Sequence, residues 1–252
     1  MGSSLSKFYD LSGQVAVVTG GAQGIGLAIA TLLAEQGATA ILVDRNPDAD
    51  RIASALGNNS RGLAVDVRDD AAVRSAVDGI AGREGRIDIL VNNVGIAPIG
   101  AAAEFGTADW DMTFAINLRA AFLFSQAAGR HMIARKYGRI VSLASQAALV
   151  ALDGHVAYAA SKAGIIAMSK VLALEWGPLG ITVNAISPTV VNTELGREVW
   201  AGEKGRVFRE KIPVGRFGEV DEIAHAVLYL VSGAAGLING ENLVIDGGYT
   251  VV

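Results

Sequence analysis

The feature that most constrains the fold is a glycine-rich turn between an apolar run and a helical run near the start of the chain. Residues 14–19, QVAVVT, are short, apolar and rich in valine, which is typical of a buried strand. TGGAQGIG continues to residue 26, and LAIATLLAEQG at 27–37 has helical length with Gly37 as a C-terminal cap. A second buried strand, ATAILVD, follows at 38–44. The pattern predicts a βαβ unit with a glycine-rich first turn.

Such a turn is suited to binding a dinucleotide. Glycines let the backbone turn tightly and approach a pyrophosphate, while the helix N-terminus offers unpaired N–H groups and the positive end of its dipole. Asp44 ends the second strand, where a carboxylate can accept hydrogen bonds from the adenine ribose hydroxyls and repel a 2′-phosphate. Arg45 is the counter-argument, because a nearby arginine can accommodate that phosphate. We therefore expect NAD as the cofactor; a solvated Asp44 that caps the next helix is the alternative.

The rest of the chain continues the alternation of strand and helix. Apolar runs predict further strands at 61–67, 86–95, 138–145, 180–187 and 241–248. Helical spacing predicts helices near 47–56, 69–83, 107–136, 157–177 and 219–232. Alternating elements favour one α/β domain over residues 1–252, with a doubly wound seven-stranded parallel sheet and helices on both faces. Ligands of such sheets bind at the carboxyl ends of the strands.

Composition excludes several classes of function. The chain has no cysteine, so disulfides and thiol nucleophiles are absent, and its three scattered histidines predict no metal site. A net charge of −4 without a basic stripe argues against nucleic-acid binding. Residues 11–34 carry no charge over a length that could span a membrane, but glycines and polar side chains divide them into strand, turn and helix. With no signal peptide recognisable, we expect a cytoplasmic protein without a membrane partner.

Three residues carry the chemistry. Tyr158 and Lys162 are four positions apart in an apolar helical stretch and therefore share a face of the helix. An ammonium there favours the ionised phenol and lowers its pKa from about 10, which lets the tyrosine exchange a proton with an alcohol. Ser145 ends the predicted strand at 138–145, where its hydroxyl can hold the substrate oxygen. Taken alone, a Tyr-x-x-x-Lys pair is weak evidence, and an ordinary helical pair with an unrelated serine is the alternative.

Together, TGGAQGIG, NNVG at 92–95, this trio and SPTVVNT at 187–193 resemble the short-chain dehydrogenase/reductase family over essentially the whole chain. The resemblance implies a Rossmann fold in which Tyr158 is the general acid/base and Ser145 orients the reacting oxygen. It implies that Lys162 lowers the pKa of the phenol and binds the nicotinamide ribose. Asn117, which is catalytic on this resemblance, anchors a water in the proton relay; an interior helix amide that caps a kink is compatible with that role. The implied cofactor contacts are Gly20, Gln23, Gly24, Ile25, Gly26, Asp44, Arg45, Asp66, Val67, Asn93, Gly95, Tyr158, Lys162, Val191 and Thr193.

Two positions depart from the family pattern. Thr189 follows Pro188 where the family usually has glycine, which removes backbone freedom near the nicotinamide and narrows the pocket. Val94 replaces the usual alanine in the NNVG motif, a milder change. Asn92 in that motif is expected to tie its strand to a neighbouring strand.

The substrate is the least constrained part of the prediction. Residues 192–212, NTELGREVWAGEKGRVFREKI, are expected to form a lid, and their charges suit a small hydroxylated substrate. The chain is most similar to the NAD-dependent sugar-alcohol dehydrogenases of the family, so we expect a small alcohol or ketone substrate. His155 lies three residues before Tyr158 and can reach the pocket, although a surface histidine is the alternative. The expected substrate contacts are Ser145, His155, Tyr158 and Trp200.

Two other functions stay open, together with the oligomeric state. A 3-oxoacyl-carrier-protein reductase would use the basic segment 130–139 to dock an acidic partner, but Asp44 argues against its usual NADP. A non-catalytic nucleotide-binding protein on the same fold would not need the trio. The helices predicted at 107–136 and 157–177 carry apolar residues on more than one face, and this surplus predicts burial against a second subunit. The resemblance to the family implies that the oligomer is a homotetramer.

Overall fold

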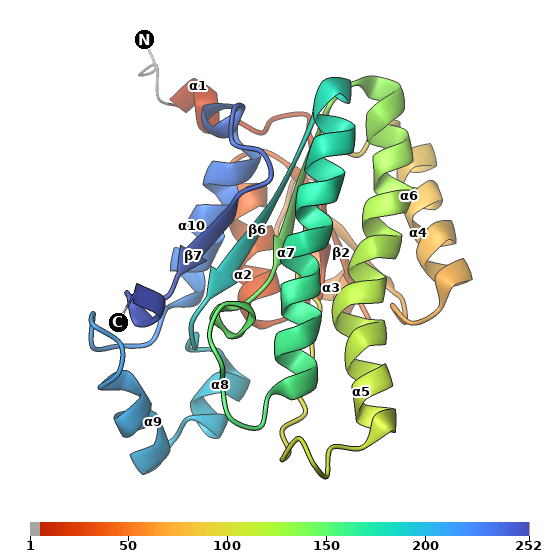
Figure 1. The fold of residues 1–252 in the computed structure, drawn as a ribbon. Coiled ribbons are helices and arrows are strands. Elements are labelled where there is room, and N and C mark those ends of the chain that lie inside the picture. The colour runs from red at the N-terminus through yellow and green to blue at the C-terminus, as the bar shows by residue number, and fades with distance from the viewer. Residues whose placement is uncertain (1–5, 252) are drawn as a thin grey trace.

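The strands pair in parallel across one sheet in the computed structural model, which describes residues 6–251 (Figure 1). Within these residues the order is β3-β2-β1-β4-β5-β6-β7, which confirms the predicted doubly wound, seven-stranded sheet. The order reverses between β1 and β4, and this switch point opens a crevice for ligands at the carboxyl ends. The strands are β1 Val15–Thr19, β2 Thr39–Asp44, β3 Arg61–Ala64, β4 Ile89–Asn92, β5 Gly138–Leu143, β6 Ile181–Pro188 and β7 Asn242–Ile245.

Helices cover both faces of the sheet because successive side chains of a strand point to opposite faces. In β1, Ala16 and Val18 pack in one core with Ile29 of α2, and Val17 packs in a second core with Phe124 of α6. Helices α2 and α10 therefore lie on one face, and α4, α6 and α7 on the other (Figure 1). The α-helices are α1 Ser6–Tyr9, α2 Gly24–Glu35, α3 Ala49–Ser54, α4 Asp70–Glu84, α5 Thr107–Phe114, α6 Ala120–Arg135, α7 Val156–Trp176, α8 Glu194–Val199, α9 Gly202–Arg209 and α10 Val220–Val231.

Several predicted boundaries move in the structure. The strand expected at 61–67 ends at Ala64, because the chain turns away after Val65 N–H donates to the Asp44 carbonyl. The helix expected at 107–136 is interrupted by a π-helical segment, Ala115–Arg119, between α5 and α6. Gly37 directly follows the C-cap residue of α2 with φ 97°, which matches its predicted capping role.

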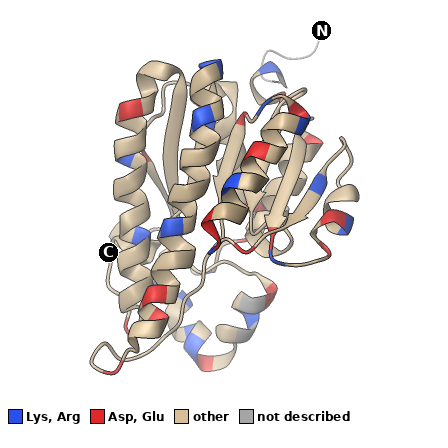
Figure 2. Ribbon diagram, turned by 90° about the vertical axis from the view of Figure 1, so that its right-hand side faces the viewer, with Lys and Arg blue, Asp and Glu red and all other residues tan. Residues whose placement is uncertain are grey.

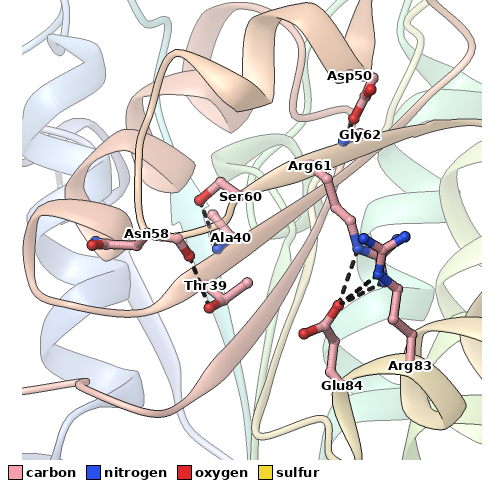
Figure 3. Close-up of polar contacts among 9 residues, drawn as sticks. All are labelled: Thr39, Ala40, Asp50, Asn58, Ser60, Arg61, Gly62, Arg83 and Glu84. Atoms are coloured by element: carbon pink, nitrogen blue, oxygen red, sulfur yellow. Dashed lines mark hydrogen bonds and ion pairs between the residues drawn. The ribbon is translucent and has the colours of Figure 1, made fainter.

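The edge strand β3 is secured by side chains from three elements (Figure 3). Arg61 donates to Glu84 at the end of α4 through Nε and Nη2, at 3.0 and 2.9 Å. The Asp50 carboxylate of α3 accepts from Gly62 N–H at 2.9 Å, and the Ser60 hydroxyl accepts from Ala40 N–H of β2 at 3.1 Å. The Asp50 bond satisfies a backbone group that an edge strand would otherwise leave unpaired, and the other two bonds tie β3 to its neighbours.

Two apolar stretches of membrane-spanning length belong to the sheet architecture. Residues 11–34 contain β1, the glycine turn and most of α2, as predicted. Among residues 6–251, the helical run Val156–Leu179 also meets the length and hydropathy expected of a span. It packs along β6 and buries Ser161 and Lys162, so it covers the sheet.

Candidate active site

The predicted trio meets at the carboxyl edge of the sheet. Ser145 follows the end of β5 and begins a 3₁₀ turn, where its Oγ accepts from Ala147 N–H at 3.1 Å. Tyr158 lies in the first turn of α7, and Lys162 lies one turn later with only 4% of its surface exposed. The Lys162 Nζ donates to the Leu143 carbonyl and is 5.7 Å from the centre of the Tyr158 ring. A protonated lysine has two further donors there for ligand hydroxyls.

Burial favours the neutral form of both Tyr158 and Lys162. Burial raises the pKa of Tyr158, and the interaction with the Ser145 hydroxyl offsets only part of this rise. Burial also lowers the pKa of Lys162 from 10.5 to about 8. In this structure Lys162 does not bring the pKa of the phenol below its ordinary value, and its effect on the phenol during the reaction stays a prediction. Desolvation outweighs the i, i+4 spacing, and Nζ is directed at the Leu143 carbonyl.

Asn117 lies in the π-helical segment and joins three elements. Its side chain is 1% exposed; Oδ1 accepts from Ile96 N–H at 2.8 Å, and Nδ2 donates to the Ile96 carbonyl at 2.9 Å. Nδ2 also donates to the Ser161 hydroxyl of α7 at 3.0 Å. Gly95 lies between Asn117 and Lys162, since a Cβ at Gly95 would be 3.4 Å from Asn117 Oδ1 and from Lys162 Nζ. A narrow space therefore remains between the side chains of Asn117 and Lys162. The π-helical segment is an irregularity of the helix, as in the interpretation of Asn117 as an interior amide that caps a kink.

The N-terminus of α2 fits a phosphate group. Gln23 is the N-cap residue, and its side chain makes no capping hydrogen bond, so the first N–H groups of the helix stay open. Gly20 and Gly24 have φ of 63° and 55°, which favours glycine. Gly26 permits close packing, because a Cβ there would be 2.1 Å from the Gly20 carbonyl oxygen. Ile25, the second residue of α2, is half-buried.

Asp44 is held in one orientation at the end of β2. Its Oδ2 accepts from Ala22 N–H at 3.1 Å and its Oδ1 from Asn46 N–H at 3.0 Å. Each oxygen retains a lone pair for a ribose hydroxyl. Arg45 beside it is exposed. These contacts fit the predicted ribose site, and they place the carboxylate next to the glycine turn.

The residues expected around the adenosine are only partly free. Asp66 forms an ion pair with Arg68, with Nε–Oδ1 at 2.9 Å, and this guanidinium lowers the pKa of the carboxyl to about 2. Val67 is buried in the core beside it. Asn93 Nδ2 donates to the Thr19 and Gly20 carbonyls, both at 3.1 Å, so its amide braces the glycine turn.

Asn92 has the structural role that was predicted for it. Its Nδ2 donates to the Ser142 hydroxyl of β5 and to the Ser125 hydroxyl of α6, both at 3.0 Å. The side chain thus ties β4 to the neighbouring strand and to the helix above it.

The lid segment begins beside the glycine turn. Val191 is buried and pairs with Gly218 in an isolated bridge, and a Cβ at Gly24 would be 3.4 Å from the Thr193 methyl. Residues 192–212 contain α8 and α9, which were not predicted as helices and which lie below the strand ends in Figure 1. A groove of about 520 Å³ separates this segment from α2 and α10.

The two predicted substrate contacts beyond the trio lie in different surroundings. His155 caps α7, and its ring centre is 6.1 Å from that of Tyr158. Its Nδ1 is 2.7 Å from the Asp153 carbonyl, which only accepts, so Nδ1 donates and Nε2 is the free acceptor of the neutral ring. Trp200 instead packs in an aromatic cluster with Phe208 and Phe217, at ring distances of 4.7 and 6.1 Å.

Two polar residues that follow the ends of β5 and β6 have unpaired side-chain oxygens within the described residues. Gln146 follows Ser145 directly, and Thr189 follows β6; both have an unpaired, covered side-chain oxygen. The only sequence signal was Thr189 itself, at a position where glycine is usual. No group of three or more His, Cys, Asp or Glu side chains in residues 6–251 is arranged to hold a metal.

Comparisons with known proteins show what the chain is similar to over almost its whole length. A family model described as Enoyl-(Acyl carrier protein) reductase matches residues 20–250. D-threitol dehydrogenase of Mycolicibacterium smegmatis is 53% identical over 247 residues, which cover 96% of this chain and 95% of that protein. NAD-dependent glycerol dehydrogenase of Listeria innocua is 49% identical, with 97% of each chain covered. The 3-oxoacyl-[acyl-carrier-protein] reductase of Escherichia coli is 36% identical, with 96% and 100% covered.

A solved structure shows the same fold. A gluconate 5-dehydrogenase from Burkholderia cenocepacia, in complex with NADP and tartrate, superposes with a TM-score of 0.95 at 35% identity. The superposition covers 98% of this chain and 99% of that one.

Proposed function

The chain belongs to the short-chain dehydrogenase/reductase family, and on that premise we propose that it is an NAD-dependent dehydrogenase that oxidises a secondary hydroxyl of a small polyol. The observation that carries the proposal is the meeting of Ser145, Tyr158 and Lys162 at the crevice of the sheet, beside an open helix N-terminus. The two polyol dehydrogenases at 49–53% identity support the substrate class.

The trio suggests how a proton leaves the alcohol. Ser145 donates a hydrogen bond to the substrate oxygen, and the Tyr158 phenolate takes its proton. Lys162 would hold the ribose hydroxyls of the cofactor and would pass the proton toward water near Asn117. A bound nicotinamide would supply the hydride acceptor and, when oxidised, a positive charge beside the phenolate. Because burial raises the pKa of Tyr158, this added positive charge is needed for the phenol to act near neutral pH.

The cofactor would lie across the switch point of the sheet. The pyrophosphate would lie against the turn from Gly20 to Gly26 and the adenine ribose against Asp44, with Asp66 and Val67 beside the adenine. Val191 and Thr193 would contact the carboxamide. His155, with its free Nε2, would accept a hydrogen bond from the substrate, while the lid at 192–212 with Trp200 would close over it.

Asp44 should set the choice of cofactor. NAD is the proposal because the carboxylate is fixed in place by two backbone N–H groups and would repel a 2′-phosphate. We expect Asp44→Ala to shift the NAD-to-NADP ratio of kcat/KM toward NADP by at least about tenfold, the effect of losing one strong interaction, since Arg45 is left to meet the phosphate. Asp48→Ala, at an exposed carboxylate a few residues on, is the matched control. Equal use of both cofactors by the wild type would refute the NAD assignment.

A substrate screen tests the proposal as a whole. NAD-linked oxidation would be measured with threitol, glycerol, other sugar alcohols and simple secondary alcohols, and NADH- or NADPH-linked reduction with 3-oxoacyl thioesters. We expect turnover with polyols. If the protein reduces acyl thioesters and oxidises no polyol, the proposal is wrong and the protein is a 3-oxoacyl-carrier-protein reductase.

The structure does not favour the basic segment 130–139 as a docking site for the carrier protein of a 3-oxoacyl-carrier-protein reductase. The basic segment 130–139 lies where α6 ends and β5 begins, at the amino edge of the sheet. Ser145 lies beyond the opposite end of β5, so a carrier docked on this segment would be on the wrong side of the sheet. The helices of this view carry both acidic and basic residues (Figure 2), and His131 of α6 pairs with Asp78 of α4 at 2.7 Å.

We further propose a cytoplasmic homotetramer. A groove of about 530 Å³ on α5, the π segment, α6 and α7 is lined by apolar side chains, including Phe114, Leu118, Phe122 and Met168. Phe122 is 42% exposed, which is unfavourable for a large aromatic ring unless another surface covers it.

A further inference from the structure

A small apolar cluster lies beyond the carboxyl ends of the strands, separate from the cores on the two faces of the sheet. Its side chains come from four segments: the loop after β5, the residues directly after β6, the lid with the residues that follow it, and the C-terminal turn after β7. The members of this lid cluster are Leu152, Val190, Trp200, Phe208, Ile212, Phe217 and Tyr249. The cluster therefore joins parts of the chain that surround the crevice.

The C-terminal turn supplies one ring of the lid cluster and is itself held by a buried carboxylate. Asp246 is 6% exposed, and its two oxygens accept from Gly248 N–H at 2.9 Å and from Thr250 N–H at 2.8 Å. Tyr249 lies between these two bonds. Its ring is stacked on Phe208 of α9, with ring centres 5.1 Å apart and planes 9° apart. The turn thus presents a fixed ring against which α9 packs.

On its other side the lid cluster reaches the turn next to the trio. The carbonyl of Leu152, a member of the cluster, accepts from His155 N–H at 3.2 Å. The ring centre of His155 is 6.1 Å from that of Tyr158. Trp200 of the lid lies 4.7 Å from Phe208 between ring centres. The cluster thus connects the turn that carries His155 with the lid that is proposed to cover the substrate.

The two ends of the lid are held by different contacts. At its start, Asn192 N–H donates to the Gly218 carbonyl at 2.8 Å, and Asn192 Nδ2 donates to Glu219 Oε1 at 2.6 Å. At its far end, Phe208 is held by the ring of Tyr249. Loss of that ring should loosen the far end and leave the first residues of the lid, which are proposed to contact the cofactor, in place.

We propose that Tyr249 is a positioning residue for the substrate: its ring holds α9, and through the lid cluster the turn of His155, in the arrangement that binds the polyol. The inference rests on the proposed polyol dehydrogenase function. When only a fraction of the molecules has the binding arrangement, the apparent affinity falls by that fraction. Tyr249 therefore affects the KM of the polyol and not the binding of the cofactor.

The test compares three variants in KM for an oxidised polyol and in NADH affinity by fluorescence titration. Tyr249→Ala removes the ring, Tyr249→Phe keeps it, and Tyr229→Ala removes an exposed tyrosine of α10 outside the cluster as the matched control. We expect Tyr249→Ala to raise KM about two- to tenfold, the effect of losing one aromatic pair, with unchanged NADH affinity. The other two variants should match the wild type. If Tyr249→Ala does not fold, Tyr249→Leu, which keeps an apolar side chain without a ring, takes its place with the same expectation.

Limited proteolysis measures the lid itself. Lys204 and Arg206 are exposed in α9, and trypsin cleaves there only when the helix opens locally. We expect faster cleavage at these two residues in Tyr249→Ala than in the wild type and in Tyr249→Phe.

The outcomes separate the inference from the function on which it rests. An unchanged KM, an equal loss of polyol and NADH affinity, or a raised KM without faster cleavage of the lid would overturn the role of Tyr249 and leave the dehydrogenase function standing. If the wild type oxidises no polyol, the proposed function fails and the inference fails with it.

Discussion

Tyr158 and Lys162 illustrate how one buried helix face shifts two ionisable groups in opposite senses. The pKa of the phenol rises and that of the ammonium falls, since burial disfavours the charged form of each. Burial thus acts against the ionised phenol that the proposed reaction requires.

Removing the phenol should stop the reaction without removing the cofactor. We expect Tyr158→Phe to lower kcat by about 10²–10⁴-fold, the usual contribution of a general acid or base. NAD affinity should change little, because its proposed contacts are mainly backbone groups and Asp44. Steady-state rates and fluorescence titration with NADH measure the two effects. Tyr137→Phe, whose hydroxyl is 3.4 Å from Gln14 Oε1 at the far edge of the sheet, is the control. A variant that keeps more than about a tenth of the wild-type rate would refute the assignment.

Lys162 should make the stability of the protein depend on pH in a definite direction. Its pKa is lowered to about 8 in the folded chain from an ordinary value of 10.5. Between these values the unfolded chain retains a proton that the folded chain has released, so the free energy of unfolding increases with pH. We expect the difference between wild type and Lys162→Met to grow in favour of the wild type from pH 8 to pH 10.5 in urea unfolding. The exposed Lys170→Met on the same helix should show no such slope; a flat difference for Lys162→Met would contradict the buried lysine.

At the scale of elements, α2 depends on close contact between its first turn and β1. A Cβ at Gly26 would be 2.1 Å from the Gly20 carbonyl oxygen and 2.5 Å from Asn93 Nδ2, and neither can move without opening the turn. Gly82 of α4 has open space around the corresponding position and lies on an exposed helix face.

These two glycines should therefore respond oppositely to the same substitution. We expect Gly26→Ala to lower the free energy of unfolding by about 1–3 kcal/mol, as overpacking does, and to weaken NADH binding. Gly82→Ala should raise the free energy of unfolding by up to about 1 kcal/mol, through helix propensity alone. Urea denaturation and NADH titration measure both effects. A Gly26→Ala protein with unchanged stability and binding would show that the turn tolerates a side chain.

Helix α9 shows how aromatic contacts hold the lid against the rest of the protein. In α9, Phe208 stacks on Tyr249 from the C-terminal turn, with ring centres 5.1 Å apart and planes 9° apart. Trp200 lies against the other side of this cluster, 4.7 Å from Phe208. The lid is therefore fixed at its outer end by rings from residues far apart in the sequence.

At the scale of the whole molecule, the apolar residues that the sequence predicts on more than one face of the long helices are partly buried in the core and partly exposed. Phe124, Ile165 and Leu172 are buried within the chain, whereas Phe122 is exposed and Met168 is half-buried beside it. Phe122 and Met168 line one groove, where we expect a second subunit to bind.

A charge in this groove should therefore break the assembly. We expect the wild type to have a mass several times 26.0 kDa in light scattering and Phe122→Glu to have a smaller mass. The reason is that a carboxylate buried without a partner costs several kcal/mol. Arg74→Glu, a charge reversal on the exposed face of α4, should leave the mass unchanged. A wild type of 26.0 kDa at micromolar concentration would refute the oligomer.

Sequence by itself determined the sheet, the order of its elements and the meeting of the trio. The strands, the glycine turn and Gly37 each follow from patterns within a few residues, and a right-handed, doubly wound connection then leads their carboxyl ends to one edge. Asn92 was expected, within the family resemblance, to tie its strand to a neighbour, and its amide donates to Ser142 of β5.

Only the tertiary structure decided the features that depend on distant partners. The π segment at Asn117 is stabilised by Ile96 and Ser161, which lie far away in sequence. Helix α9 is packed through Phe208 against Tyr249, a contact with a residue outside the lid. Burial, which raises the pKa of Tyr158, could not be read from the spacing of Tyr158 and Lys162. Local periodicity records which face of an element is apolar, whereas burial, unpaired polar groups and charge arise from contacts that exist only once the chain has folded.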